Sequence, residues 1–329
     1  MKDILNRLFD HKTLGKAQSK ETLKEIALGQ CNPSEMAAFI TVYLMRSITV
    51  DELEGFRDAM LELCIPVEID EYNPIDLCGT GGDSKNTFNI STLSSFVVAA
   101  SGVNVAKHGN HGVSSVSGSS TVLEYFGAKF TNDIGLLKKK LDTTGICFLH
   151  APLFHPAMKN VAPIRKELGV KTFFNMLGPM VNPAFPKNQL VGVFNLELAR
   201  LYNYLYQKTN KKYTILHSLD GYDEISLTGS FKIFSNNKEQ LFRPEQLGFR
   251  TLQQEELFGG DTIEKSAEIF EKVIRGEGTE AQNNAVIANA GMAIHTAKPE
   301  VSLSDCLETA KENLLSKKAL GVFQRFIEK

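Results

Sequence analysis

Residues 74–102, PIDLCGTGGDSKNTFNISTLSSFVVAASG, carry the signal that decides the fold of this chain. A short apolar run at 75–78 is followed at once by three closely spaced glycines. The stretch NISTLSSFVVAASG then has the pattern of a helix that ends at Gly102. A strand, a glycine-rich loop and a helix in this order are typical of an α/β protein.

The same alternation continues toward the C-terminus. Strand patterns recur at 104–107, 146–150, 189–194 and 213–218. Helical patterns lie between them or follow them, at 119–126, 156–168, 196–207 and from about Ser266 to the end. SLTG and SFKIFS, at 226–235, have the pattern of a late hairpin. The sequence therefore predicts an α/β fold with a central, mostly parallel sheet flanked by helices.

The first 66 residues contain helix signals and no strand signal. Asn32, Pro33 and Glu35 predict a capped helix start, and Thr49 with Glu52 predicts a second capping box. We therefore expect a small all-helical domain at 1–66, whose apolar faces are covered by another part of the chain or by a second subunit.

Length and charge narrow the class of protein. A chain of 329 residues predicts two domains or one large α/β unit. The net charge of −2 gives no general attraction to nucleic acid or to an anionic membrane. Five scattered cysteines, with no CxxC pair, are typical of reduced thiols in a cytoplasmic protein. Neither a signal peptide nor a membrane-spanning run is recognisable, so we expect no membrane partner.

Two glycine- and hydroxyl-rich loops have the composition of anion-binding loops. Gly79-Thr80-Gly81-Gly82-Asp83 follows a strand and precedes a helix, although a tight turn without a ligand fits the same pattern. Asp83 favours a cation or ligand hydroxyls nearby. The loop from Lys107 through Ser120 also follows a strand, which predicts a second anion-binding loop at the same edge of the sheet.

Three further features have both a binding and a structural interpretation. Asn89, Ser91 and Thr92 either cap a helix or bind phosphate and a metal. Asp223 and Glu224 form either a solvated turn or a magnesium site. Arg165 is either a surface cation or the bidentate partner of a carboxylate. Residue types alone leave these alternatives open.

Taken in order, these motifs resemble those of the anthranilate phosphoribosyltransferase family. CGTGGD, NIST, KHGN with SS.SGSS.VLE, R.ELG.KTFFN.LGP..NP and LDGYDE occur in the family order over 76–224. The helical opening and the tail, with NNAVIANAGMAI, are also similar, so the resemblance covers nearly the whole chain. The resemblance implies transfer of the phosphoribosyl group of phosphoribosyl pyrophosphate (PRPP) to the amine of anthranilate, with Mg²⁺ as cofactor.

The resemblance also implies a domain arrangement and a set of site residues. The helical domain 1–66 would be joined by roughly 165–185, with 67–164 and 186–329 forming the PRPP-binding domain, and the chain would form a homodimer through its helices. Ser91, Asp223 and Glu224 would bind the metal, Lys107 would act on the leaving group, and Arg165 would orient the acceptor. The substrate-binding residues would be Gly79, Gly82, Asp83, Thr87, Asn89, Ile90, Ser91, Thr92, Lys107, His108, Gly109, Asn110, Ser114, Ser115, Ser119 and Arg165.

Three residues in or directly after the loop from Lys107 through Ser120 depart from the commonest family pattern. His111 and Val116 stand where basic or polar residues are frequent, and Thr121 replaces a frequent Asp. Two other functions remain as alternatives. A pyrimidine nucleoside phosphorylase would cleave nucleosides with phosphate and without a metal. A nucleic-acid-binding homologue would carry a strongly basic surface, which the net charge opposes.

Overall fold

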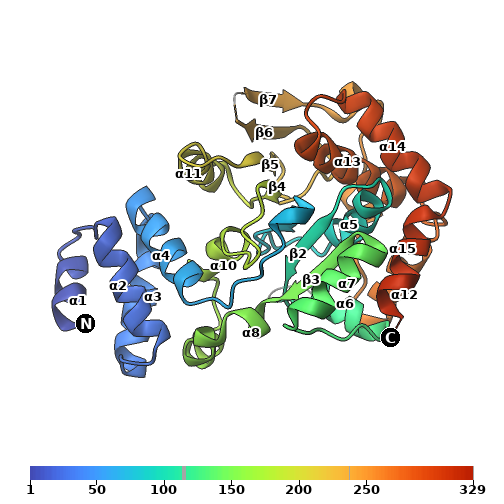
Figure 1. Cartoon of the computed structure of the whole chain (residues 1–329). Helices are drawn as coiled ribbons and strands as arrows, with labels where there is room; N and C mark the ends of the chain where they lie inside the picture. The colour runs from blue at the N-terminus through green and yellow to red at the C-terminus, as the bar shows by residue number, and fades with distance from the viewer. Residues whose placement is uncertain (113–115, 237, 329) are drawn as a thin grey trace. The chain divides into compact units, whose positions relative to one another are not determined.

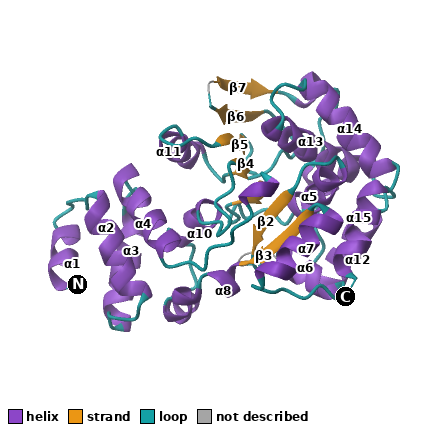
Figure 2. Cartoon of the chain, viewed as in Figure 1, coloured by secondary structure: helices purple, strands orange, loops and turns teal. Residues whose placement is uncertain are grey.

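The computed structural model describes residues 1–112, 116–236 and 238–328, and the chain divides into two compact units (Figure 1). One unit combines Met1–Pro66 with Ala151–Phe185, and the other combines Val67–His150 with Pro186–Lys329. The second segment of the first unit thus begins at Ala151, whereas the family resemblance implied a start at roughly 165. Within the described residues, the first unit contains only helices and turns, and all strands belong to the second (Figure 2).

The helical unit begins with four helices, of which α3 and α4 start at the predicted capping signals. Asn32 and Glu35 form a complete capping box at α3, and Thr49 and Glu52 form another at α4, as the sequence predicted. The helices of this unit are α1 (Lys2–Phe9), α2 (Lys16–Ala27), α3 (Pro33–Met45), α4 (Val50–Glu62), α8 (Ala151–Phe154), α9 (Ala162–Leu168) and α10 (Phe174–Leu177), with 3-10 turns at Pro156–Asn160 and Gly178–Met180.

An aromatic cluster joins the two segments of the helical unit. Phe39, Tyr43 and Phe56 come from α3 and α4, and Phe173 comes from the segment before α10. The rings of Phe56 and Phe173 stack with centroids 4.7 Å apart, and Phe39 and Tyr43 meet Phe173 edge to face. Burial of these rings explains why the chain returns to this unit after 84 residues of α/β structure, from 67 to 150.

The α/β unit is built on one seven-stranded sheet. The strand order is β3-β2-β1-β4-β5-β6-β7, with β1 to β5 parallel and β6 and β7 antiparallel. This confirms the predicted mostly parallel sheet. The strands are β1 (Ile75–Gly79), β2 (Val105–Gly109), β3 (Ile146–His150), β4 (Asn188–Gly192), β5 (Lys212–Ser218), β6 (Phe231–Ser235) and β7 (Lys238–Phe242).

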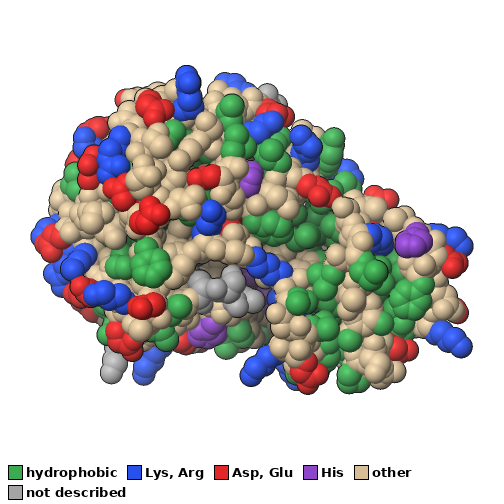
Figure 3. Space-filling view, turned by 180° about the vertical axis from the view of Figure 1, so that it is seen from behind, with side chains coloured by type: hydrophobic (Ala, Val, Ile, Leu, Met, Phe, Trp, Pro, Cys, Tyr) green, Lys and Arg blue, Asp and Glu red, His purple; other side chains and the backbone are tan. Residues whose placement is uncertain are grey.

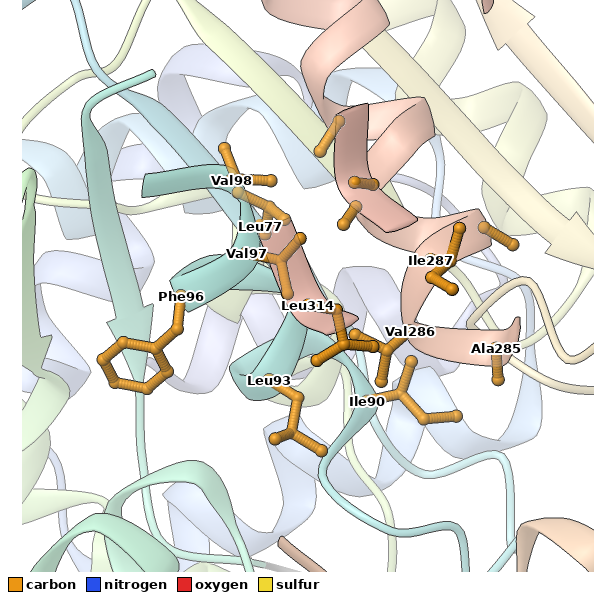
Figure 4. Packing of buried hydrophobic residues seen from close by; sticks show 14 of the residues in the cluster. Leu77, Ile90, Leu93, Phe96, Val97, Val98, Ala285, Val286, Ile287 and Leu314 are labelled. Carbon is orange, nitrogen blue, oxygen red and sulfur yellow. The ribbon is translucent and has the colours of Figure 1, made fainter. Parts of the chain in front are cut away.

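Helices cover the sheet and enclose its core. Leu93 and Val97 of α5 pack close to Val286 of α13 and Leu314 of α14, all fully buried (Figure 4). The helices are α5 (Ile90–Ala100), α6 (Ser119–Tyr125), α7 (Ile134–Thr144), α11 (Leu196–Tyr206), α12 (Ile263–Ile274), α13 (Glu280–Ala297), α14 (Leu303–Leu315) and α15 (Lys318–Ile327), with 3-10 turns at Asp70–Tyr72, Pro244–Leu247 and Gln254–Leu257. This packing fixes α5, whose N-terminus faces the loops described below.

The structure corrects two details of the predicted elements. The hairpin pairs β6 with β7, and residues 226–229 are a turn, because Leu227 has a φ of 60° and the Ser226 and Thr228 hydroxyls bond to each other. The helix predicted at 156–168 is a 3-10 turn followed by α9, which begins after Val161. No helix in the described ranges is both long and apolar enough to cross a membrane.

Candidate active site

The strand order brings several loops of the α/β unit to one edge of the sheet. The chain continues from β1 to β2 and β3 on one side, and then returns to β4 and β5 on the other. Parallel sheets bind ligands beyond the carboxyl ends of their strands, near such a reversal. The loops that follow β1, β2 and β5 are the ones whose sequences are rich in glycine, hydroxyl groups and carboxylates.

The glycine-rich loop after β1 closes around the carboxylate of Asp223. The Gly81 N–H donates to Asp223 Oδ2 at 2.7 Å. A Cβ at Gly79 would lie 2.3 Å from the same oxygen, so any larger residue would displace it. Gly81 and Gly82 have φ angles of 63° and 75°, which favour glycine. The loop sequence is therefore required to bring the backbone close to the acidic residue after β5.

The paired acids after β5 are held at the N-terminus of α5. The Ser91 N–H donates to Glu224 Oε1 at 3.0 Å. Burial raises the pKa of Asp223 to about 7, with Asp83 adding its charge and a hydrogen bond. Burial also raises the pKa of Glu224 well above its ordinary value, followed by the charges of Asp223 and Asp83. Asp223 is only 8% exposed, which excludes the solvated-turn interpretation, and the three carboxylates lie close enough to repel one another.

Lys107 is a buried cation beside these acids. Its side chain is only 2% exposed, and its Nζ donates to the Leu77 carbonyl at 2.6 Å and contacts Ser91 Oγ at 3.4 Å. Burial lowers the pKa of Lys107, and the charges of Asp76, Cys78 and Glu224 oppose that effect. Ser91 therefore connects the ammonium group of Lys107 with the carboxylate of Glu224.

Asn89 links the loop after β1 to the loop after β2. It occupies the N-cap position of α5, but its side chain makes no capping bond, and its Nδ2 donates to the Ser117 carbonyl at 2.9 Å. The capping interpretation of Asn89 is therefore wrong. On the other side, Thr87 forms an isolated bridge with Phe258, and Asn86 Nδ2 donates to the Gly260 carbonyl at 2.8 Å.

The loop after β2 is compact where the structure describes it. A Cβ at Gly109 would lie 2.4 Å from Ser119 Oγ, and Ser119 in turn contacts the Asn110 carbonyl at 3.3 Å. His111 Nδ1 lies 3.3 Å from Thr121 Oγ1, so two of the residues that depart from the family pattern contact each other. The predicted binding residues Ser114 and Ser115 lie outside the described residues.

Other predicted site residues have different environments. Ile90 is fully buried in the hydrophobic core, and Thr92 is 1% exposed within α5. His108 donates its backbone N–H to Asp76 Oδ1, and its side chain alternates to the sheet face opposite Lys107. Asp83 Oδ1 accepts the Lys85 N–H at 3.0 Å.

Arg165 belongs to the helical unit, where its side chain is half-buried. Burial lowers the pKa of Arg165. The guanidinium carbon lies 5.1 Å from the ring centroid of Phe174, and Nη2 is 3.5 Å from Asn175 Oδ1. Among the described residues, no carboxylate forms an ion pair with Arg165. A half-buried cation whose neighbours are an amide and a ring is suited to receive an anionic ligand.

Two residues near the loops were not singled out from the sequence. Lys85 Nζ lies 4.6 Å from the ring centroid of Tyr222, beside the acidic pair. Asp76 is fully buried in β1. A signal existed for Asp76, because a carboxylate inside the apolar run at 75–78 needs a partner.

The donor set fits a hard divalent cation and phosphate oxygens. Carboxylates with raised pKa values, such as those of Asp223 and Glu224, are stabilised in their charged form by a cation. No group of three or more His, Cys, Asp or Glu side chains in the described ranges forms a ready metal cage. Mg²⁺ is commonly held by one or two carboxylates together with substrate phosphates, which matches this arrangement.

Comparison with known proteins now defines the class. Residues 71–320 match the family described as glycosyl transferase family, a/b domain, and residues 2–64 match its helical bundle domain. The chain is therefore a two-domain member of the glycosyl transferase family.

Individual relatives identify the family more closely. The chain is 63% identical to anthranilate phosphoribosyltransferase from Flavobacterium johnsoniae over 100% of this chain and 99% of the relative. It superposes on the crystal structure of anthranilate phosphoribosyltransferase from Thermus thermophilus with a TM-score of 0.91 and 31% identity, covering 98% of both chains. The Saccharomyces cerevisiae protein in complex with PRPP and Mg has the same fold, with a TM-score of 0.90 and 24% identity, over 98% of this chain and 95% of the yeast chain. The chain belongs to the anthranilate phosphoribosyltransferase family.

Proposed function

We propose that this chain transfers the 5-phosphoribosyl group of PRPP to the amine of anthranilate, which gives N-(5-phosphoribosyl)anthranilate and pyrophosphate. The observation that carries the proposal is the acid pair Asp223–Glu224, held by N–H groups of the loop after β1 and of α5 beside the buried Lys107. A relative at 63% identity with the name of this activity supports it.

The α/β unit would bind PRPP. Backbone N–H groups of the loop after β1 and the N-terminus of α5 are suited to phosphate oxygens. Asp223 and Glu224, with the Ser91 hydroxyl, would hold Mg²⁺, which supplies positive charge to the pyrophosphate group. Lys107 would neutralise charge that develops on the leaving group, because its ammonium already lies 3.4 Å from Ser91 Oγ. The remaining predicted ligands are Gly79, Gly82, Asp83, Thr87, Asn89, Thr92, Gly109, Asn110 and Ser119.

Arg165 of the helical unit would bind the carboxylate of anthranilate. Two parallel N–H···O bonds would fix the plane of the acceptor and leave its amine free to attack C1 of the ribose. The C1–O bond to pyrophosphate breaks as the C1–N bond forms, and the amine then loses a proton. The aromatic amine is nucleophilic without a strong base, so the residues mainly orient substrates and stabilise charge.

The helical unit would also mediate a homodimer. Phe9, Leu28, Leu44 and Met45 of this unit expose between 45% and 84% of their surface. Figure 3 shows hydrophobic side chains gathered over the helical unit, at the right of the view. Exposed apolar groups of this kind favour association with a second copy. Sedimentation velocity would test this, and a monomer at micromolar concentration would exclude the dimer.

Product analysis tests the proposed reaction. The protein is mixed with PRPP, anthranilate and Mg²⁺, and the products are identified by mass spectrometry. N-(5-phosphoribosyl)anthranilate with an equal amount of pyrophosphate supports the proposal. Inactivity in this mixture, combined with phosphorolysis of pyrimidine nucleosides without a metal, would instead identify a nucleoside phosphorylase.

A further inference from the structure

Strands β1 and β2 are neighbours, yet their pairing differs from that of the other parallel strands. Only Ile75 and Val105 are in register between β1 and β2. Five residue pairs join β1 to β4, and five join β2 to β3. The regular ladder of β1 and β2 therefore ends after its first pair, close to the loops of the candidate site.

Two charged side chains bridge the strands where the ladder ends. Asp76 Oδ1 of β1 accepts the backbone N–H of His108 in β2 at 3.2 Å. Lys107 Nζ of β2 donates to the backbone carbonyl of Leu77 in β1 at 2.6 Å. Each bond joins a side chain of one strand to the backbone of the other, so the pair supplies inter-strand bonds in place of regular ones.

The Asp76 carboxylate is also the principal negative charge that favours the charged form of Lys107. Asp76 is fully buried and Lys107 is 2% exposed. Among the groups that raise the pKa of Lys107, Asp76 comes first, ahead of Glu224. Gln189 of β4 donates to Asp76 Oδ2 at 3.4 Å, and its Oε1 accepts from Tyr206 at 2.8 Å. The carboxylate is thus held from both neighbouring strands.

We propose that Asp76 is a positioning residue, which keeps the charged Lys107 between β1 and β2 with its ammonium directed toward Ser91. The effect on turnover rests on the proposed role of Lys107 in phosphoribosyl transfer. The structural coupling between Asp76 and Lys107 does not depend on that role. The coupling and the role of Lys107 in the reaction can therefore be refuted separately.

A double-mutant cycle in thermal stability tests the coupling. Lys107→Met leaves the Asp76 carboxylate buried without its cation, and we expect the Tm to fall by about 5 °C or more. Adding Asp76→Asn removes that charge while the amide oxygen can still accept from His108, so we expect the double variant to recover at least half of the loss. A Tm loss in the double variant that equals the sum of the single losses would overturn the proposal.

Kinetics test the positioning role. Asp76→Asn should lower kcat about tenfold or more and leave the KM for anthranilate within about twofold, because the acceptor site is elsewhere. Asp70→Asn, at a side chain that is 69% exposed, is the matched control and should keep full activity. In the Lys107→Met background, Asp76→Asn should cause no further loss of kcat. A further loss there, or unchanged kcat in Asp76→Asn alone, would contradict the positioning role.

Should Lys107→Met not fold, Lys107→Gln replaces it, with the same expected recovery by Asp76→Asn. If the unmutated protein is active but the Asp76 and Lys107 substitutions have additive effects, only this inference is refuted. A parent that forms no product would refute the proposed function, whereas the stability cycle would still decide whether Asp76 and Lys107 are coupled.

Discussion

The two units bury charge in opposite ways. The α/β unit brings Asp223 and Glu224 together with Asp83, and their shared burial raises the pKa values of the pair. The helical unit buries Arg165 against Phe174 and Asn175, and burial lowers the pKa of this guanidinium. The first site has an excess of negative charge and the second an excess of positive charge. The difference indicates which ligand each site requires, namely a cation with phosphates in one and a carboxylate in the other.

The two sites also differ in what holds them. Backbone N–H groups of Gly81 and Ser91 fix the acids, so their positions follow from loop geometry at the strand ends. Aromatic packing fixes the environment of Arg165, because the Phe173 and Phe174 rings stack with centroids 4.4 Å apart. Substitutions should therefore affect metal-dependent properties in the α/β unit and acceptor affinity in the helical unit.

Removal of one acid should give the largest effect. We expect Glu224→Gln to lower kcat by about 10²–10³-fold, because the pyrophosphate charge loses a metal ligand. Without Mg²⁺ the variant should have a higher Tm than the parent, since one of the mutually repelling carboxylates is gone. Steady-state kinetics and thermal unfolding with and without Mg²⁺ measure both effects.

The exposed Glu264→Gln is the matched control and should behave as the parent. Activity of Glu224→Gln within threefold of the parent would contradict the assignment of this carboxylate to the metal.

Loss of the guanidinium should act on the acceptor alone. Arg165→Ala should lower kcat/KM for anthranilate by about 30- to 1,000-fold, corresponding to ~2–4 kcal/mol, and leave the KM for PRPP within about twofold. The neighbouring exposed Lys166→Ala serves as the control. An equal rise in the KM for anthranilate and in the KM for PRPP would show that Arg165 does not act on the acceptor alone.

Acid should weaken the helical unit through His155. Burial lowers the pKa of this histidine to about 4 from its ordinary value of 6.5, and its Nε2 lies 2.9 Å from the Val181 carbonyl. The unfolded chain therefore binds more protons between pH 6.5 and 4, and the free energy of unfolding should fall by up to ~3 kcal/mol across that window. Urea unfolding of the parent and of His155→Gln over this range measures the difference. A parallel pH dependence in the two proteins would refute the assignment to His155.

The ring beneath Arg165 should give the smallest effect. Phe174→Leu keeps an apolar side chain but removes the cation–π contact, which is worth about 1 kcal/mol in a partly buried site. We expect the KM for anthranilate to rise about fivefold with kcat nearly unchanged. A KM that stays within a factor of 1.5 would indicate that packing alone orients the guanidinium.

The sequence determined the fold well where local signals were strong. The structure contains the strand expected at 75–78, the capped helices at Asn32 and Thr49, and the parallel alternation. The helix Ile134–Thr144 was not anticipated, although Asp133 caps it and Gly145 ends it in the left-handed conformation. Its exposed polar face, with three consecutive lysines, obscured the apolar stripe formed by Leu137 and Leu141.

The site was predictable in its residues and less so in its contacts. The motifs named Asp223, Glu224 and Lys107, but a linear sequence does not reveal that Gly81 would donate to Asp223 across 142 positions. The link from Asn89 to Ser117 replaced an expected helix cap, because the side-chain amide donates to a carbonyl of the loop after β2 and makes no bond to the first turn of α5. Asp76 was overlooked, since its significance depends on where the β1–β2 ladder ends.

Loss of anthranilate fluorescence tests the central claim most directly. The protein is incubated with anthranilate and PRPP, first with EDTA and then after excess Mg²⁺ is added. The account predicts no change with EDTA, rapid loss after Mg²⁺ is restored, and at most about 1% of that rate in Glu224→Gln. Fluorescence that remains constant at high protein concentration with Mg²⁺ present, or that decays equally in EDTA, would contradict a magnesium-dependent transfer to anthranilate.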